Sequence, residues 1–262
     1  MWINPDEIIK NLDMKGVEVR LAYFDEVDST NRVAKSFIDD GVKDRLVVIS
    51  ATQTAGRGRF LRSWVSPPGG LYTSLIVRPV LSPADTPLLG LLAGCSTAAA
   101  VHTTCSVDVH LKWPNDIIVD DKKIGGILSE SIIEGEQVVS IVLGIGINVN
   151  LRLDDYPEGL RNGITTILHE TGQETSIEEL AASLLGETYS RISEVEARQT
   201  FLSVLSEYKR VCNTLGRRVI VEQTDVTLEG TALDIEESGA LVLETDEGIE
   251  VVSAGDVRHL RS

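Results

Sequence analysis

The sequence lacks the patterns that mark several common classes of protein. Its three cysteines, Cys95, Cys105 and Cys212, are scattered and never spaced as Cys-x-x-Cys. This spacing fits neither a disulfide framework nor a zinc site, and it predicts reduced thiols in a cytoplasmic protein. We expect no apolar run long enough to cross a bilayer, and the polar, charged residues near the N-terminus do not resemble a signal peptide.

Positive charge is also scarce. The chain has 40 acidic residues against 24 Lys and Arg, which leaves a formal net charge of −16. Such a surface repels nucleic acid, and the sequence has no basic stretch of the length that DNA contact would need. Two common phosphate-binding loops are missing as well. There is no Gly-x-x-x-x-Gly-Lys-Ser/Thr segment, and Leu61 stands where a dinucleotide-binding loop requires its third glycine.

The most informative stretch that is present is the loop over residues 53–64, which follows a buried strand expected over residues 46–51. Glycine lets the backbone approach a ligand, arginine offers fixed donors to phosphate or carboxylate, and tryptophan offers a flat surface for a ring. In an acidic protein this combination predicts a site for a small anionic ligand, although a solvated basic turn has a similar composition. The residues concerned are Gly56, Arg57, Gly58, Arg59, Arg62 and Trp64.

Three further stretches carry polar residues or glycines at places where a ligand can bind. Residues 29–31, Ser-Thr-Asn, precede a helix expected over residues 31–40, and they fit either a helix cap or a polar ligand site. Residues 112–116, Lys-Trp-Pro-Asn-Asp, follow a strand and fit either a rigid ligand-binding corner or a solvated turn. Paired glycines at residues 125–126 and 144–146 predict close approach of the backbone to a ligand or to a neighbouring strand.

The order of elements predicts a mixed helix and strand domain followed by a small all-strand domain. We place the domains at residues 1–215 and 216–262. In the first, helices are expected over residues 4–14, 31–40, 84–104, 177–195 and 196–215, and strands over residues 17–24, 46–51, 71–77, 107–111, 117–119, 124–131 and 138–149. In the second, strands are expected over residues 219–221, 227–233, 240–243 and 249–252, which indicates a small β-barrel.

In their order along the chain, these stretches resemble the motifs of biotin protein ligases. The resemblance covers nearly the whole chain, because the C-terminal strands are similar to the small SH3-like domain of the same family. It implies an α+β fold with a mixed, mostly antiparallel sheet flanked by helices, of the class II synthetase type, followed by an SH3-like β-barrel. The matching stretches are residues 29–31, 53–54, 56–59 with Trp64, 112–116, 125–130 and 144–148.

The resemblance also implies an activity. Members of this family join biotin to ATP, which yields biotinyl-5'-AMP and pyrophosphate, and then transfer biotin to one lysine of a biotin carboxyl carrier protein. Mg²⁺ would arrive with ATP and have no dedicated protein ligands, and a homodimer is expected. Some members carry an N-terminal winged helix-turn-helix that binds DNA. Because only about sixteen residues precede the first expected strand, the resemblance implies a ligase without a repressor function.

Site residues follow from the resemblance by motif position. The expected catalytic residues are Arg57, Arg59, Lys112 and Asp116. The expected biotin-binding residues are Ser29, Thr30, Asn31, Gln53, Arg57, Gly58, Arg59, Lys112, Gly126 and Gly144. The expected ATP- and adenylate-binding residues are Arg57, Arg59, Arg62, Trp64, Lys112, Asn115 and Asn148.

Some of these roles have alternatives. Asp116 would position the incoming lysine, and Asn148 would either contact adenine or only hold the end of its strand. Leu61 departs from the family, which often has glycine there, so we expect this side chain to keep the loop from positive φ and to change how it closes.

Three other functions fit part of the sequence. A lipoate or octanoate ligase would need an apolar lining, and not the polar set of residues 29–31 and Gln53. A non-catalytic biotin sensor would bind biotin without releasing pyrophosphate, and the lysine and the arginines argue against it. A generic nucleotide-binding module explains the loop but not residues 29–31.

Overall fold

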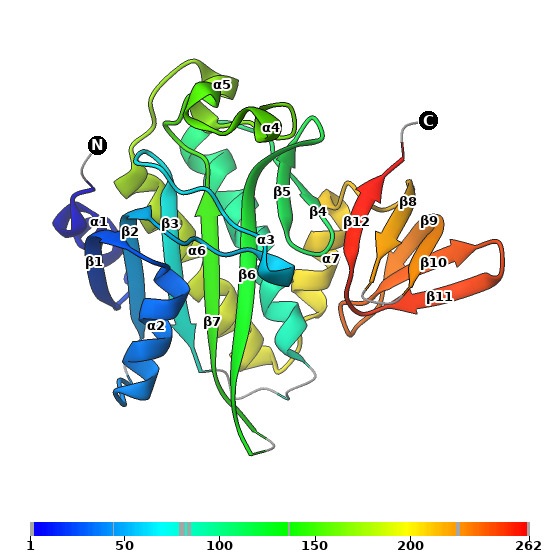
Figure 1. The fold of residues 1–262 in the computed structure, drawn as a ribbon. Coiled ribbons are helices and arrows are strands. Elements are labelled where there is room, and N and C mark those ends of the chain that lie inside the picture. Colours follow the sequence, from blue (N-terminus) through cyan, green and yellow to red (C-terminus); the bar gives the residue numbers. More distant parts are fainter. Residues whose placement is uncertain are drawn as a thin grey trace.

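Two β-sheets organise the protein, seen in a computed structural model (Figure 1). The first has seven strands in the order β1-β2-β3-β7-β6-β5-β4, and the second has five in the order β11-β10-β9-β8-β12. The outer ends of the two predicted domains, residues 1–2 and 261–262, lie outside the described residues. The structure describes residues 3–43, 45–78, 82, 85–135, 137–223 and 226–260.

The seven-stranded sheet is mixed and mostly antiparallel, as predicted. Strands β1 and β2 are parallel, and every other neighbouring pair is antiparallel. The most apolar strand, β7, lies in the middle of the order. The strands are β1 Arg20–Val27, β2 Leu46–Gln53, β3 Leu71–Val77, β4 His110–Lys112, β5 Asp116–Val119, β6 Lys122–Glu134 and β7 Gln137–Ile147.

Alternation along β7 gives the sheet two different faces. Leu143, Ile145 and Ile147 are buried in the large hydrophobic core on one face. Because successive side chains point to opposite faces, Gly144 and Gly146 lie on the other face. The side chains of Asn31 and Trp64 occupy the space above these two glycines.

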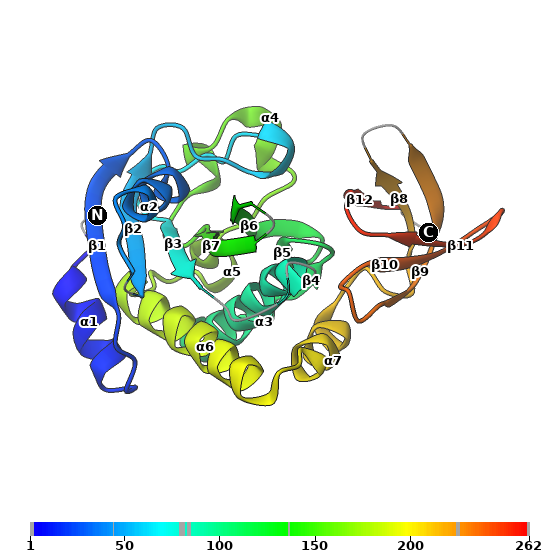
Figure 2. The same ribbon diagram turned by 90° about the horizontal axis from the view of Figure 1, so that it is seen from below.

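Helices cover both faces of this sheet (Figure 2). Helices α1, α3, α6 and α7 lie on the core side, and α2 packs on the opposite face beside β2, β3 and β7. Side chains cap the starts of α1 and α6, since Asn4 and Ser176 accept from the N–H groups of Asp6 and Glu179. The helices are α1 Pro5–Asp13, α2 Thr30–Asp39, α3 Thr86–Cys105, α4 Glu158–Arg161, α5 Ile167–Thr171, α6 Ile177–Arg198 and α7 Leu202–Val211, with 3-10 turns η1 Arg59–Leu61 and η3 Leu153–Asp155.

Helix α3 corrects one prediction. By length and composition this helix could cross a membrane, with a mean hydropathy of 1.4 over its most apolar window, so the expectation that no apolar run is long enough was wrong. However, 61% of that window is buried inside the fold, where α3 packs against α6. An apolar helix with this burial is what a protein core needs. Ala84, the predicted first residue of the helix, lies outside the described residues.

The helix expected over residues 196–215 was also wrong in its bounds. Helix α6 continues to Arg198, where Gln199 adopts a left-handed conformation with φ of 54°. Helix α7 then ends at Val211, because Cys212 is extended and the N–H of Asn213 donates to the carbonyl of Leu111. The chain therefore leaves the helix to run beside the edge strand β4.

The second sheet is antiparallel throughout and includes a strand that the sequence analysis missed. Strand β12 pairs with β8 and returns the chain toward the first sheet. The hydrogen bonds between the two domains include one from the indole N–H of Trp113 to the Gly239 carbonyl at 3.0 Å and one from Arg59 to the Gly255 carbonyl at 3.1 Å. The strands are β8 Arg218–Glu222, β9 Thr227–Ile235, β10 Leu241–Thr245, β11 Gly248–Val252 and β12 Asp256–His259.

Candidate active site

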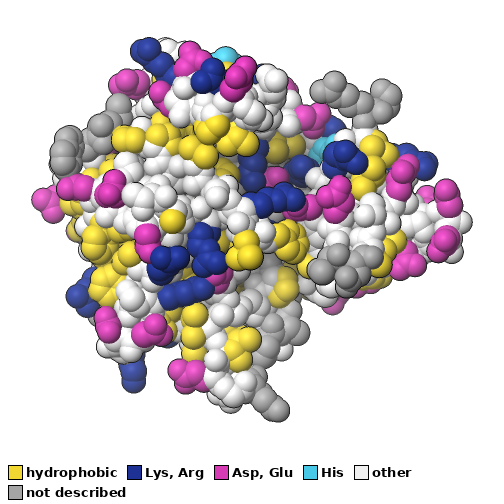
Figure 3. Space-filling model, viewed as in Figure 1, with side chains coloured by type: hydrophobic (Ala, Val, Ile, Leu, Met, Phe, Trp, Pro, Cys, Tyr) yellow, Lys and Arg dark blue, Asp and Glu magenta, His cyan; other side chains and the backbone are white. Residues whose placement is uncertain are grey.

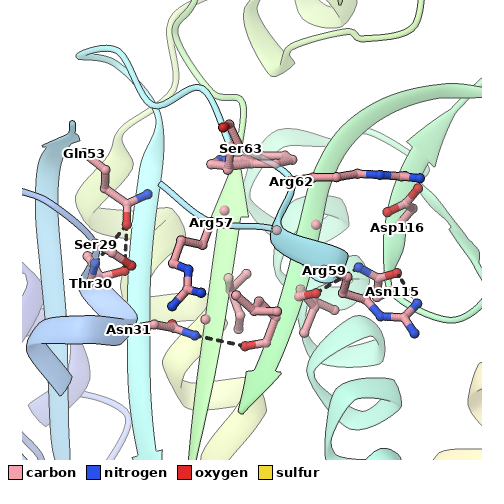
Figure 4. Close-up of a pocket in the computed structure, with 18 of the residues that line it drawn as sticks. Ser29, Thr30, Asn31, Gln53, Arg57, Arg59, Arg62, Ser63, Asn115 and Asp116 are labelled. Atoms are coloured by element: carbon pink, nitrogen blue, oxygen red, sulfur yellow. Dashed lines mark hydrogen bonds between the residues drawn. The ribbon is translucent and has the colours of Figure 1, made fainter. Parts of the chain in front are cut away.

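A cavity opens on the glycine-bearing face of the seven-stranded sheet (Figure 4). It holds about 140 Å³ and receives residues from α2, β2, the loop after β2, β5, β6, β7 and β12. Lys and Arg side chains gather near the middle of this face, although the whole chain is acidic (Figure 3). The lining residues are Ser29, Thr30, Asn31, Gln53, Arg57, Gly58, Arg59, Arg62, Ser63, Trp64, Asn115, Asp116, Lys123, Gly126, Ile127, Leu128, Gly144, Ile145, Gly146 and Asp256.

One end of the cavity, here called the amide end, is formed by Ser29, Thr30, Asn31 and Gln53. The N–H and hydroxyl of Thr30 lie 2.9 and 3.1 Å from Oε1 of Gln53. Oγ of Ser74, on β3, lies 2.6 Å from Oδ1 of Asn31 and 2.8 Å from Oγ1 of Thr30. Because an amide oxygen only accepts, Ser74 must donate to Asn31. The direction of the hydrogen bond between Ser74 and Asn31 therefore follows from the chemistry of the two groups.

The other side of the Asn31 amide is held by β6. Its Nδ2 donates to Glu130 at 2.7 Å and to the Leu128 carbonyl at 3.3 Å. Burial alone would raise the pKa of Glu130, but hydrogen bonds from Lys35 and Asn31 and the nearby Arg57 charge lower it below its usual value. Glu130 is thus an anionic anchor for a side chain of the amide end.

Glycine at position 144 makes room for Asn31. A Cβ there would lie 2.2 Å from Oδ1 of Asn31, closer than real contacts allow. Ser29 is the residue before α2, but its side chain makes no capping hydrogen bond. The first interpretation of residues 29–31, a side-chain cap on the helix, is therefore not observed at Ser29.

The loop after β2 forms a hairpin, here called the arginine hairpin, over residues 56–64. The N–H of Trp64 donates to the Gly56 carbonyl at 2.8 Å, and the N–H of Gly58 donates to the Arg62 carbonyl at 2.7 Å. At its tip, Phe60 and Leu61 have φ of 51° and 60°. The expectation that Leu61 would avoid positive φ was wrong: the leucine adopts it with its side chain 85% exposed, at a cost of roughly 1–2 kcal/mol.

The opposite end of the cavity, here called the arginine end, carries charges of both signs. The residues are Arg57, Arg59, Arg62, Asn115, Asp116, Lys123 and Asp256. Arg59 donates to Asn115 at 3.3 Å as well as to Gly255, and burial lowers its pKa. Arg62 forms an ion pair with Asp256, the first residue of β12. The second sheet thus supplies part of the cavity wall, which the sequence analysis did not anticipate.

Lys123, and not Lys112, brings a lysine to the cavity. Its Nζ lies 2.6 Å from Oδ1 of Asp116 and 5.2 Å from the centre of the Trp64 ring. Lys112, expected to be catalytic, is not a lining residue; its Nζ is 3.9 Å from Oδ2 of Asp116, and burial lowers its pKa. Lys123 precedes the strand expected over residues 124–131, whereas β6 begins at Lys122. The available signal was a lysine just ahead of the paired glycines at residues 125–126.

Trp64 lies flat against the glycines of the sheet. A Cβ at Gly146 would lie 2.6 Å from the indole Nε1, and a Cβ at Gly126 would lie 3.4 Å from its Cζ3. Nε1 is buried and has no hydrogen-bond partner among the described residues. Gly126 and Gly146 therefore leave a flat area of the sheet large enough for an aromatic ring, here called the glycine platform. The indole ring of Trp64 covers it.

Asn148 is held at the end of β7 by its amide nitrogen, while its buried Oδ1 has no hydrogen-bond partner among the described residues. It is 1% exposed, does not line the cavity, and its Nδ2 donates to the Thr165 carbonyl at 3.0 Å. Of its two expected roles, the geometry supports holding the end of β7. The remaining expected site residues all line the cavity, so the motifs far apart in the sequence do meet.

Comparison with known proteins agrees with this geometry. Residues 23–148 match the model of the biotin/lipoate A/B protein ligase family, and residues 214–260 match the biotin protein ligase C terminal domain. The chain is 31% identical over 256 residues to the bifunctional ligase/repressor BirA of Bacillus spizizenii, covering 97% of this chain and 78% of that protein.

Two further relatives are similar over most of their length. The biotin–[acetyl-CoA-carboxylase] ligase of Mycobacterium tuberculosis is 34% identical over 226 residues, covering 83% of this chain and 80% of that protein. The biotin protein ligase from Aquifex aeolicus in complex with biotin and ATP superposes with a TM-score of 0.81 at 28% identity, covering 93% of this chain and 99% of that one.

Proposed function

The chain belongs to the biotin/lipoate A/B protein ligase family, and from this premise we propose how its cavity works as a biotin protein ligase. The enzyme activates biotin with ATP and then transfers it to a lysine of a biotin carboxyl carrier protein. The observation that carries the proposal is one cavity with two chemically different ends, a buried uncharged network and a cluster of cations.

The first step needs the cations. A carboxylate oxygen of biotin attacks the α-phosphorus of ATP, the bond to the β-phosphate breaks, and pyrophosphate leaves. Both reactants are anions, so the site must supply positive charge where they meet. Arg57, Arg59 and Lys123 are the groups that we assign to this task, and Lys123 takes the role that the sequence suggested for Lys112.

The amide end suits the ureido ring of biotin, which is neutral and both donates and accepts hydrogen bonds. Ser29, Thr30, Asn31 and Gln53 are hydroxyl and amide groups of the matching kind. Gly58 would let the hairpin backbone approach the carboxylate, and the glycines of β6 and β7 keep the floor flat. A lipoate ligase is the alternative, and its fatty chain would leave this polar set without partners.

The second step transfers biotin. The lysine nitrogen attacks the acyl carbon, AMP leaves with the bonding electrons, and the amine loses its proton. The pKa of a free lysine is about 10.4, so at neutral pH its amine is protonated and must lose one proton before it attacks. We assign its positioning to Asp116, whose carboxylate is already paired with Lys123 at 2.6 Å.

The arginine hairpin must open and close during this cycle. A cavity of about 140 Å³ is smaller than the roughly 300–1,000 Å³ of typical ligand pockets. We propose that Trp64 moves off the glycine platform to admit the nucleotide, with its ring then covering the adenine. Arg62 and Asn115 would bind the phosphates, and the closed hairpin would keep water from the reactive acyl-adenylate.

Mg²⁺ would enter with the ATP phosphates. Among the described residues no cluster of three His, Cys, Asp or Glu could hold a metal ion, and the two carboxylates that line the cavity are both paired with cations. This donor set fits a metal that is bound mainly by phosphate oxygens.

The wider biology is part of the same proposal. The three cysteines are free, which supports a cytoplasmic enzyme, and the net charge of −16 supports a protein that does not bind DNA. The homodimer rests on the family resemblance, and light scattering after size exclusion measures it directly. A domain boundary near residue 215 is supported by the match of residues 214–260.

The decisive experiment uses purified protein, biotin, ATP and a biotin carboxyl carrier domain. We expect pyrophosphate release that requires biotin, followed by a mass increase of the carrier on one lysine. Lipoate and octanoate serve as matched substrates. Equal or faster release with either would overturn the choice of biotin, and binding of biotin without any pyrophosphate would indicate a sensor.

A further inference from the structure

Ser66 lies outside every motif described above, yet it joins the two halves of the cavity. It follows the arginine hairpin by two residues and is 5% exposed. Its Oγ lies 2.8 Å from Nε2 of Gln53 and 3.1 Å from the Trp64 carbonyl oxygen. The N–H of Gln53 also donates to the Ser66 carbonyl at 3.2 Å. Ser66 is therefore bonded both to the amide end and to the base of the hairpin.

The direction of these bonds is fixed by chemistry. A backbone N–H can only donate, so the atom of Gln53 that faces the Thr30 N–H at 2.9 Å must be the oxygen Oε1. The NH₂ group of Gln53 then necessarily faces Ser66 and donates to it. The Ser66 proton is left to donate to the Trp64 carbonyl. The chain of bonds therefore runs in one direction, from Gln53 through Ser66 to Trp64.

Gly56 supplies independent support for this contact. A Cβ at Gly56 would lie 2.4 Å from the Trp64 carbonyl oxygen, 2.7 Å from Oγ of Ser66 and 3.1 Å from Nε2 of Gln53. The absence of a side chain at position 56 thus leaves room for these three groups to meet. The hydrogen bonds of Ser66 therefore depend on glycine at position 56.

We propose that Ser66 is a positioning residue that couples biotin at the amide end to the arginine hairpin. The proposal rests on the proposed function, because it takes biotin as the ligand of Gln53 and Thr30. A ligand that hydrogen-bonds at the amide end restrains the Gln53 amide, and Ser66 passes that restraint to the Trp64 carbonyl. Biotin then orders the hairpin before ATP arrives.

Hydrogen exchange of the full-length protein tests this coupling. In the wild type, saturating biotin without ATP should slow exchange of residues 56–66 by about tenfold, the effect of one well-made hydrogen bond. In Ser66→Ala, biotin should still bind, but the slowing should fall to less than about twofold, and the KM for ATP in the presence of biotin should rise by about tenfold. Ser66→Thr, which keeps the hydroxyl, should restore both values.

A matched control separates coupling from stability. Ser96 is also a buried serine, and its hydroxyl donates to the Leu92 carbonyl at 2.9 Å within α3. Ser96→Ala should lose stability without changing the response of the hairpin to biotin. If biotin protects the hairpin of Ser66→Ala as well as that of the wild type, the proposal is overturned.

A second variant covers the case in which Ser66→Ala does not fold. Gln53→Glu keeps the shape, but a carboxylate only accepts, so Ser66 must turn its proton away from Trp64. Loss of biotin-dependent protection in this variant at a biotin concentration that still saturates it supports the coupling, and full protection refutes it. A wild-type protein that neither binds biotin nor releases pyrophosphate would instead overturn the proposed function.

Discussion

The two ends of the cavity are built on different principles. At the amide end, Ser29, Thr30 and Asn31 are at most 4% exposed. Thr30 and Asn31 bond to side chains of the seven-stranded sheet, namely Gln53, Ser74 and Glu130. At the arginine end, Arg62 is 65% exposed in its side chain and pairs with Asp256 from the other sheet. A neutral ring can bind to a hydrogen-bond network that already exists, whereas a phosphate that binds Arg62 must displace its anionic partner Asp256.

The largest expected effect compares the two lysines. Lys123→Met should reduce biotin-dependent pyrophosphate release by about a hundredfold or more, because a cation at the reacting centre is lost. Lys112→Met should reduce it by less than about fivefold, since that side chain does not line the cavity. Steady-state pyrophosphate release measures both, and a larger loss in the Lys112 variant would restore the residue chosen from the sequence.

The amide end should respond to pH through Glu130. Its pKa is lowered in the folded protein, so its contribution to stability is complete above the ordinary pKa of about 4.3 and is lost as pH falls from there through the lower pKa of the folded protein. Glu130→Gln should therefore lower the free energy of unfolding by about 1.5–3 kcal/mol at neutral pH. The difference from wild type should shrink as the buffer is acidified.

Urea unfolding from pH 7 downward measures this difference. Lys35→Met is the control, because it removes only one of the two groups that bond to Glu130. It should give a smaller loss with the same trend. A difference that does not change with pH would mean that the carboxylate charge contributes nothing at this end.

Asp256→Asn probes the exchange of partners at the arginine end. Without its anion, Arg62 is available to phosphate, so the KM for ATP should fall, by less than about fivefold because the pair is partly exposed. The KM for biotin should stay the same. Asp234 lies on the same sheet as Asp256, so Asp234→Asn, which breaks the pair with Lys209 of α7, is the matched control. A rise in the KM for ATP would show that Asp256 orders the site instead of competing with the nucleotide.

The smallest effect concerns the tip of the hairpin. Leu61→Gly relieves the left-handed strain, and Leu61→Ala removes the side chain but keeps the strain. The glycine variant should be the more stable by about 0.5–1 kcal/mol, after allowing for its greater freedom when unfolded. Urea unfolding compares them, and equal stability would mean that the tip relaxes at no cost.

Most of the seven-stranded sheet was predictable because its signals are local. The run of β7 is apolar enough to mark a central strand, and Asn4 and Ser176 mark helix starts by their own chemistry. The bounds of α7 could not be predicted in this way, because the end of the helix depends on a backbone hydrogen bond from Asn213 to Leu111, about a hundred residues earlier.

In the candidate site, too, the residues with a local sequence signal were predictable, and those placed by distant contacts were not. Residues within motifs were found, whereas Asp256 and Lys123 were not. Asp256 reaches the cavity only because β12 pairs with β8, a contact that no local pattern encodes. Lys123 follows a register shift between Ile117 and Ile118, where β5 meets β6, and such a shift changes which face a side chain occupies.

The bond from Arg59 to Gly255 has a consequence for protein synthesis. Its two residues are 196 positions apart in the chain. A ribosome that adds roughly 5–20 residues per second needs on the order of ten to forty seconds to travel from one to the other. During that interval the arginine hairpin of the growing chain cannot form its contacts with Gly255 and Asp256. The arginine end of the cavity is therefore complete only after the second domain has been translated.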